Sequence, residues 1–269
     1  MGIANLKGSF AKLQRADEHI YAIDDEIRIF ALEHAQTLRV DCKREEGWHL
    51  VYVDPLSALP DRIILIAGDC LTNIRAALDY LVWQLVLRED KKPDQGTCFP
   101  ICETPEDFLK NVRKPALRYK RSPLQGLPIN GDAWALIEKV QPFHSAEPQY
   151  HPLILFNEMA RIDKHRTPLN QRTFLDRKKL IESVRWKPGL HPIEREFPVV
   201  PLSSEHPTVI ARFRFLTDED PGMDVEGDFS PCPSIGDIKT QVGLGLLNVL
   251  VSYVRNVLKD CQTLPRVQA

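Results

Sequence analysis

Apolar side chains recur every three or four residues in the first part of the chain, which is the spacing of one helix face. Between residues 9 and 35 these positions are Phe10, Leu13, Ile20, Ile23, Ile27, Phe30 and Ala31. The next segment changes to strict alternation of apolar and polar residues, in TLRVDCK and again in WHLVYV. Alternation is typical of half-buried strands, so residues 37–54 are predicted to form a β-hairpin.

The segment from residue 60 to 88 is apolar on almost every helical face, which indicates a central, buried helix. Similar spacing predicts two shorter helices within residues 132–166 and a last long helix over residues 236–260. Between them, residues 168–228 form a β-rich segment, in which TVIARFRFL alternates like a half-buried strand. The pattern predicts an α+β fold, a mainly helical bundle of three long helices with shorter helices and a small antiparallel sheet. Because helices from both chain ends are expected to meet the central one, residues 1–269 are predicted to form a single domain with 168–228 inserted.

Composition and charge change this picture only in part. The 269 residues are 43% apolar and carry a formal net charge of −2, so bulk charge implies neither nucleic acid nor acidic partners. The charges are unevenly placed, since residues 110–187 hold 16 of the 35 Lys and Arg but only 7 of the 37 Asp and Glu. The chain begins without an apolar signal segment, its longest uncharged apolar stretch is too short to cross a bilayer, and its six cysteines are scattered. We therefore expect a cytoplasmic protein with reduced thiols and no membrane contact.

Polar residues interrupt the apolar stretch CLTNIRAALDYLVWQL of the central helix. Arg75 and Asp79 are four residues apart, so their side chains are neighbours on one face. An unpaired charge is costly to bury, so these groups must be paired, hydrogen-bonded or turned toward a cleft. The pattern permits two interpretations, a structural ion pair inside a core or dimer seam, or a functional site.

NIRAALDYLVWQL resembles the N-R-S-A-L-D-H helix of a set of bacterial and phage proteins without an assigned function. RIDKHR and VQPFH resemble further parts of the same pattern. An Arg followed by a ring side chain on a bundle helix is also similar to the R-x4-6-H signature of HEPN domains. These are helical bundles, frequently dimeric, and many cleave RNA without a metal. The resemblance implies that Arg75 holds the phosphate, while the position of the base falls on Tyr80, where the signature has His.

The chemistry explains why such a signature is useful. RNA cleavage by its own 2′-hydroxyl needs one group to take that proton and a cation to hold the charge that develops on the phosphate. An Arg and a His on one helix supply both. Tyrosine, whose unperturbed pKa is roughly 10, is a poor base at neutral pH but can donate a hydrogen bond.

A second group of polar residues ends the helix that contains NEMARIDKHR. Asp163 and His165, with the neighbouring cations, could serve as acid, base or phosphate clamp, and a helix C-terminus stabilises the charged form of His165. The alternative is ordinary helix termination, because cations are common in a last turn before a proline.

A basic strip offers phosphate-binding side chains outside the helices. Its members are Lys110, Arg113, Lys114, Arg118, Lys120 and Arg121. Such a strip predicts salt-dependent binding of RNA without sequence preference, although a solvated loop has the same composition. Metal-site spacings and nucleotide-binding glycine motifs do not occur in the sequence, so no cofactor or metal is expected.

These observations lead to one expectation and two alternatives. We expect an HEPN-like protein that binds RNA or processes it without a metal, in a defence or stress setting, and that dimerises through the central helix. The candidate catalytic residues are Arg75, Asp79, Tyr80, Asp163 and His165. The first alternative is a non-catalytic helical interaction protein, and the second is a small-molecule enzyme centred on Asp163 and His165.

Overall fold

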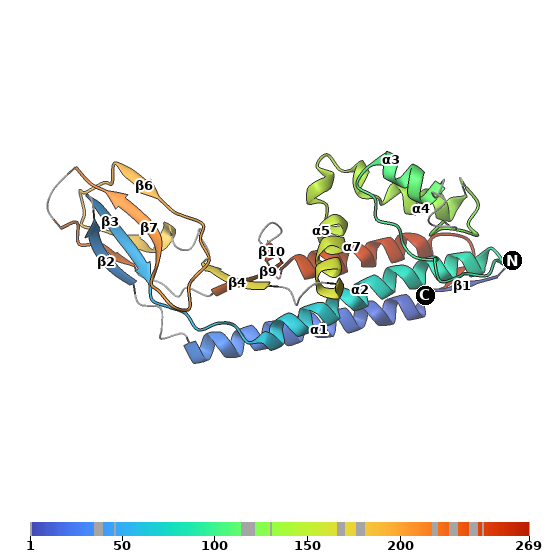
Figure 1. Cartoon of the computed structure of the whole chain (residues 1–269), viewed down its shortest axis with the longest axis horizontal. Coiled ribbons are helices and arrows are strands. Elements are labelled where there is room, and N and C mark those ends of the chain that lie inside the picture. Colours follow the sequence, from blue (N-terminus) through green and yellow to red (C-terminus); the bar gives the residue numbers. More distant parts are fainter. Residues whose placement is uncertain are drawn as a thin grey trace. The chain divides into compact units, whose positions relative to one another are not determined.

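Figure 1 shows the computed structural model of the chain. It describes residues 2–268 except 35–39, 46, 114–121, 130, 166–169, 176–180, 217–219, 226–230, 237–241 and 244. The predicted α+β fold class is confirmed, since three long helices pack together and are accompanied by small antiparallel sheets. These helices are α1 (Lys7–His34), α2 (Asp61–Arg88) and α7 (Gly245–Gln262).

The central position predicted for α2 follows from its burial. Ten of its apolar side chains are fully inaccessible to solvent: Ile63, Ala67, Cys70, Ile74, Ala77, Leu78, Leu81, Val82, Leu85 and Val86. The first part of α1 runs antiparallel to α2, because Cys70 Sγ lies 3.6 Å from Ala16 O whereas Asn5 N lies 3.1 Å from Gln84 Oε1. Burying a polar group without a hydrogen-bond partner costs free energy, so each polar side chain on the covered helix α2 is expected to have a partner or to reach solvent.

The chain divides into two compact units. Unit 1 comprises residues 1–23, 64–169 and 236–269, and unit 2 comprises residues 24–63 and 170–235. The single-domain organisation expected from the sequence stays a prediction.

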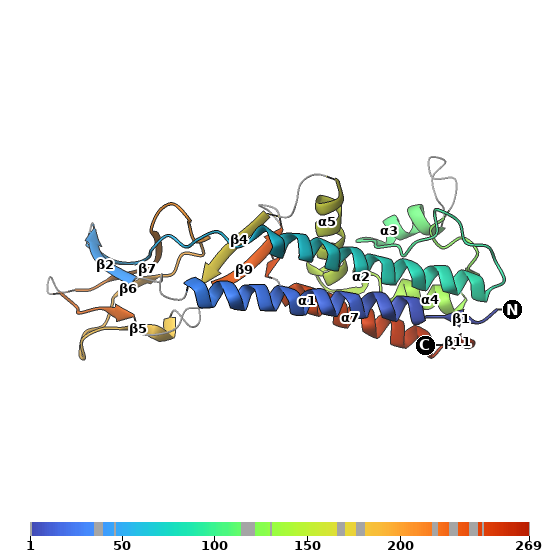
Figure 2. The same cartoon turned by 90° about the horizontal axis from the view of Figure 1, so that it is seen from below.

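Unit 1 contains the helices that surround α2. They are α3 (Pro105–Phe108), continued by a π-helical turn at Leu109–Arg113, α4 (Asp132–Lys139), α5 (Pro152–His165), and two 3-10 turns at Pro142–His144 and Pro148–Tyr150. The strands β1 (Ala4–Asn5) and β11 (Val267–Gln268) pair in parallel, so the two ends of the chain meet (Figures 1 and 2).

The last helix begins later than the pattern suggested. It was expected from residue 236, but α7 starts at Gly245, and the short strand β10 (Val242–Gly243) precedes it. Glycine is a poor helix former, and Gly243 and Gly245 both stand at this point. From Gly245 on the apolar spacing holds, and one face of α7 is buried through Leu247, Leu250, Val254 and Leu258.

Unit 2 is built on an antiparallel sheet with the order β2-β3-β7-β6. Its strands are β2 (Val40–Glu45), β3 (Trp48–Val53), β7 (Thr208–Arg214) and β6 (Glu194–Glu196). The smaller strand pairs are β5 (Val184–Arg185) with β8 (Asp224–Val225), and β4 (Asn170–Leu175) with β9 (Pro231–Gly236). The predicted hairpin is therefore present as β2 and β3, which turn at Gly47 with φ 80°.

The alternation read from TVIARFRFL holds in part. Ala211, Phe213 and Phe215 are buried in the core of unit 2, but Ile210 is buried as well. The register between β3 and β7 shifts between Val51 and Tyr52, and such an irregularity lets consecutive residues on a strand lose strict alternation.

Among the described residues, no helix has a stretch that is both long and apolar enough to cross a bilayer.

Candidate functional site

Arg75 and Asp79 hold the backbone of a buried residue from both sides. Arg75 Nε lies 3.0 Å from Asp79 Oδ2, and Arg75 Nη2 donates to Phe99 O at 3.0 Å. In return, the N–H of Phe99 donates to Asp79 Oδ1 at 2.9 Å. Because the ring of Phe99 is fully buried, its N–H and carbonyl need partners, and the pair supplies both. The two side chains are nevertheless each 31% exposed, so the guanidinium is not sealed from solvent.

Gln141 holds the same loop from another direction. Its amide accepts a hydrogen bond from Cys102 N at 3.0 Å and donates to Pro100 O at 3.0 Å. Gln141 is only 2% exposed, and it lies just beyond the C-terminal end of α4. The strings NIRAALD and VQPFH therefore meet at one loop, residues 98–102, which we call the FPIC loop. Two of the six cysteines, Cys98 and Cys102, lie on this loop.

Arg75 and Asp79 form a clamp on the backbone of Phe99, and the thiol of Cys98 lies beside this clamp. Burial raises the pKa of Cys98, and the neighbouring Arg75 opposes that rise. Burial also raises the pKa of Cys102 to about 11, with the charge of Asp107 adding to the effect. Neither thiol is activated as a nucleophile, because a reactive cysteine needs a lowered pKa.

Tyr80 lies on a different side of α2 from Arg75. Tyr80 is 47% exposed, and its ring approaches α1, since a Cβ atom at Gly8 would lie 3.3 Å from Tyr80 Cδ2. Consecutive helix positions are turned by about 100°, so Tyr80 points away from its neighbour Asp79. The structure therefore does not bring Tyr80 together with the guanidinium of Arg75.

Asp163 reaches α2 from α5 and lies over Gly68. A Cβ atom at Gly68 would be only 2.8 Å from Asp163 Oδ1 and 2.9 Å from Oδ2, so the carboxylate occupies the space that a larger residue would fill. Burial raises the pKa of Asp163, and the nearby charge of Asp69 adds to the rise. Gly68 and Arg75 share a face of α2 two turns apart, which is about 10 Å along the axis.

The remaining predicted site residues are described only in part. His165 ends α5, and its side chain lies outside the described residues, as does that of Arg113. Lys110 is exposed on the π-helical turn. The other members of the basic strip, Lys114, Arg118, Lys120 and Arg121, fall on residues that the structure does not describe.

Sequence reasoning missed Gly68, Asp69 and Gln141, although Gln141 stands in the quoted VQPFH string. A glycine inside an apolar helix was the available signal for Gly68, because glycine at such a position usually marks a close approach. Among the described residues, no three His, Cys, Asp or Glu side chains are grouped so that they could hold a metal ion.

An exposed apolar stripe runs along the C-terminal half of α2. Tyr80, Trp83 and Leu87 are spaced three and four residues apart and are 47%, 41% and 39% exposed. We call these three residues the α2 stripe. Large apolar groups that line up on one exposed helix face are typical of contact surfaces.

Comparison with known proteins adds no likeness to this geometry. The chain matches no protein-family model, no curated protein and no solved structure.

Proposed function

We propose that this chain is a non-catalytic interaction protein that pairs with a second copy of itself through the α2 stripe. One observation carries the proposal: the polar groups of α2 hold the FPIC loop, whereas Tyr80, Trp83 and Leu87 remain exposed on another side of the helix. The charged side chains that would make α2 an active site, Arg75 and Asp79, thus already have structural partners, whereas the α2 stripe has no covering partner of comparable extent among the described residues.

Charge favours a second copy as the partner. A two-fold axis places the stripe against itself, so the contact is self-complementary, and an axis perpendicular to α2 makes the two α2 helices antiparallel. The exposed Asp69 lies toward the N-terminal end of the helix, and the exposed Lys91 and Lys92 follow its C-terminal end, where they outnumber the exposed Asp90. Antiparallel pairing brings the acid of each copy toward the cations of the other, which selects this orientation over the parallel one.

The size of the stripe sets the expected affinity. A standard interface buries about 800 Å² on each partner, and three half-exposed side chains supply only part of that area. We therefore expect a weak dimer, with a Kd on the order of micromolar.

Sedimentation equilibrium across a concentration series tests this. We expect the wild type to pass from monomer to dimer, and Trp83→Glu to remain monomeric because the pairing would bury two unpaired carboxylates. Val249→Glu is the matched control, since it also adds a charge at a half-exposed apolar position, but on α7. A wild type that stays monomeric up to about 1 mM, the weak limit of a useful association, or equal effects of the two variants, would exclude the stripe as a dimer surface.

RNA processing in the HEPN manner is the second candidate, and it rests on a different observation. The Arg75 side chain is 31% exposed, and Asp163 of α5, whose pKa is raised by burial, lies over Gly68 on the same face of α2 as Arg75. A cation and a carboxyl group of raised pKa are a workable pair for phosphate chemistry near neutral pH. This proposal ranks second because the guanidinium of Arg75 is already hydrogen-bonded to the FPIC loop and paired with Asp79.

Retention and cleavage of single-stranded RNA separate the two proposals. If the second holds, Arg75→Gln abolishes cleavage while the circular dichroism spectrum is unchanged, and Arg62→Gln leaves cleavage intact because Arg62 is 71% exposed on the first turn of α2. Salt-dependent retention should then fall on charge reversal of Arg113, Lys114 and Arg118. Absence of both retention and cleavage would leave the interaction proposal alone.

A further inference from the structure

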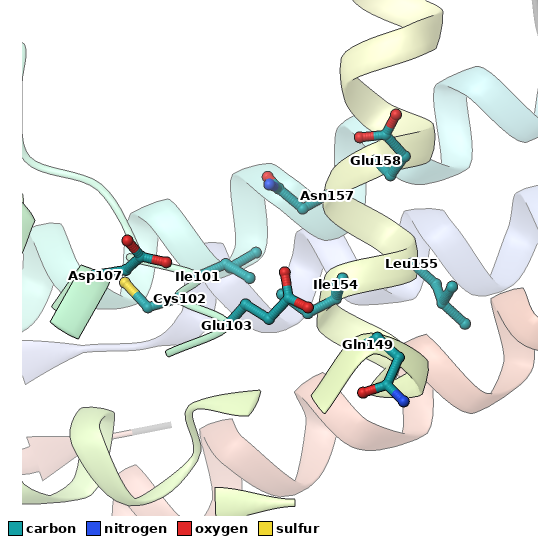
Figure 3. Close-up of a pocket in the computed structure, with 9 residues that line it drawn as sticks. All are labelled: Ile101, Cys102, Glu103, Asp107, Gln149, Ile154, Leu155, Asn157 and Glu158. Carbon is teal, nitrogen blue, oxygen red and sulfur yellow. The ribbon is translucent and has the colours of Figure 1, made fainter. Parts of the chain in front are cut away.

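A pocket of about 440 Å³ opens in unit 1, away from the α2 stripe. One wall is the segment 101–107, and the other is the N-terminal half of α5 (Figure 3). In Figure 3, Glu103 and Asp107 lie on the loop side, and Ile154 and Asn157 lie on the helix side. The volume falls within the range of pockets that hold small ligands, roughly 300–1,000 Å³.

The pocket carries negative charge without internal compensation. Three carboxylates line it, from Glu103, Asp107 and Glu158, and no cationic side chain does so among the described residues. Glu158 has an ion-pair partner in Arg161, whose Nε lies 3.0 Å from Glu158 Oε2. Within the described part of the chain, the carboxylates of Glu103 and Asp107 have no such partner. Two carboxylates facing one hollow therefore favour a cationic ligand.

The apolar part of the lining narrows the class of cation. Ile101, Ile154 and Leu155 contribute hydrocarbon surface to the same pocket. A small hydrated metal ion gains nothing from such walls, and no three His, Cys, Asp or Glu side chains among the described residues, the three carboxylates of this pocket included, are grouped so that they could hold one. An alkyl chain that carries ammonium groups matches both parts, because methylene groups bury against the isoleucines while the ammonium groups meet the carboxylates.

We propose that this pocket binds a linear aliphatic polyamine. One ammonium group pairs with Glu103 and Asp107, and the methylene chain extends along Ile101 and Ile154 toward Asn157. This site is independent of the proposed self-association, because its walls include no residue of the α2 stripe.

Titration calorimetry of the full chain with spermidine at fixed ionic strength tests the proposal. We expect saturable binding of one spermidine per chain. The double variant Glu103→Gln/Asp107→Asn should weaken it by about tenfold or more, since charge-assisted hydrogen bonds are lost. The double variant Glu18→Gln/Asp260→Asn removes the same total charge at exposed positions outside the pocket and should leave the affinity within about twofold.

A second variant guards against misfolding of the first. Asn157 is exposed, so Asn157→Lys should fold normally and place its own ammonium group at the carboxylates. We expect it to abolish spermidine binding. The proposal is overturned if the wild type shows no saturable binding, if both double variants bind alike, or if Mg²⁺ displaces spermidine at the same concentration of charge. The last result would mean general counterion attraction rather than a pocket.

Discussion

At the scale of single residues, the polar side chains Arg75 and Asp79 of the apolar helix α2 are hydrogen-bonded to the backbone of the neighbouring FPIC loop. Arg75 and Asp79 occupy both backbone hydrogen-bonding groups of Phe99, and Gln141 accepts from the N–H of Cys102 and donates to the carbonyl of Pro100. A buried loop without regular structure has no internal partners for its N–H and C=O groups, so side chains must provide them. These three residues therefore explain how the FPIC loop can lie buried against a helix.

Replacing Asp79 by alanine should expose the importance of this clamp. Asp79→Ala leaves the Phe99 N–H and the Arg75 guanidinium without their shared partner, so we expect the free energy of unfolding to fall by roughly 1–3 kcal/mol. Urea denaturation measures it. Glu18→Gln is the control, because it breaks an ion pair in which both side chains are at least half exposed and should cost under about 0.5 kcal/mol. Equal losses would show that the clamp contributes no more than a surface pair.

His151 should make stability depend on pH. It precedes α5, its Nδ1 accepts the N–H of Leu153 at 3.2 Å, and its ring packs edge-on against Tyr253. Burial lowers the pKa of His151 below its ordinary 6.5. The unfolded chain therefore takes up the proton first, so its contribution to stability is present above pH 6.5 and is lost as pH falls through the folded pKa.

The variant His151→Asn separates the titration of the imidazole from the hydrogen bond that the side chain accepts from the N–H of Leu153. Asparagine is a good N-cap, so stability at pH 8 should be retained, while part of the loss between pH 7 and pH 5 should disappear. Thermal unfolding across this range gives the comparison, and His19, whose pKa is also lowered by burial, accounts for a remaining slope. An unchanged pH profile in His151→Asn would contradict the assignment.

At the scale of elements, α5 approaches α2 closely because Gly68 has no side chain. The carboxylate of Asp163 occupies the position next to its Cα, and both Phe156 and Met159 on the same face of α5 are fully buried. Glycine inside a helix costs about 1 kcal/mol relative to alanine, so its presence here indicates a steric requirement rather than a helix preference.

A double-mutant cycle tests this close approach. Replacing a glycine inside a helix by alanine usually stabilises a protein by about 1 kcal/mol. We expect Gly68→Ala to destabilise it instead, because the new methyl group meets Asp163. In the background Asp163→Ala the same change should stabilise the protein. Gly245→Ala is the matched control, since a Cβ atom there would meet nothing within 4 Å. Additive effects of the two substitutions, measured by urea denaturation, would mean that Asp163 moves aside at no cost.

At the scale of the whole molecule, Arg88 joins parts of unit 1 that are far apart in sequence. Its side chain is 3% exposed, bonds both Asp132 at the start of α4 and Glu89, and lies 3.4 Å from Pro265 O near the end of the chain. The N–H of Gly2 donates to the backbone carbonyl of Arg88 at 3.1 Å. Both chain ends are thus tied to the C-terminal end of α2.

Arg88→Gln should loosen both ends together. The change leaves Glu89, which is 11% exposed, without its cation, so we expect a loss of roughly 2–4 kcal/mol in the free energy of unfolding. Hydrogen exchange should accelerate at Ala4 and Leu6, whose N–H groups bond the C-terminal segment. Arg62→Gln should change neither quantity. Unchanged exchange at the chain ends would show that β1 and β11 hold them without Arg88.

The candidate site could be predicted only as far as its residues lie on one element. The pair Arg75 and Asp79 follows from helical spacing alone, because residues four apart are neighbours on any helix. Its partner Phe99 lies on a loop without periodicity, so no local pattern assigns that contact. Gly68 and Asp163 likewise meet through the crossing of two helices, which the spacing within each helix does not specify.

The sequence by itself determined the elements of this protein, namely three long helices, a hairpin and a β-rich segment, because apolar periodicity is set locally by the backbone geometry. It placed Arg75 beside Asp79 for the same reason. Only the tertiary structure decided that this pair holds a buried loop, that Tyr80 turns away from it, and that Glu103 and Asp107 face α5 across a pocket. Those facts depend on how segments far apart in the chain pack together, and packing is selected by shape and by unmet hydrogen bonds rather than by spacing along the chain.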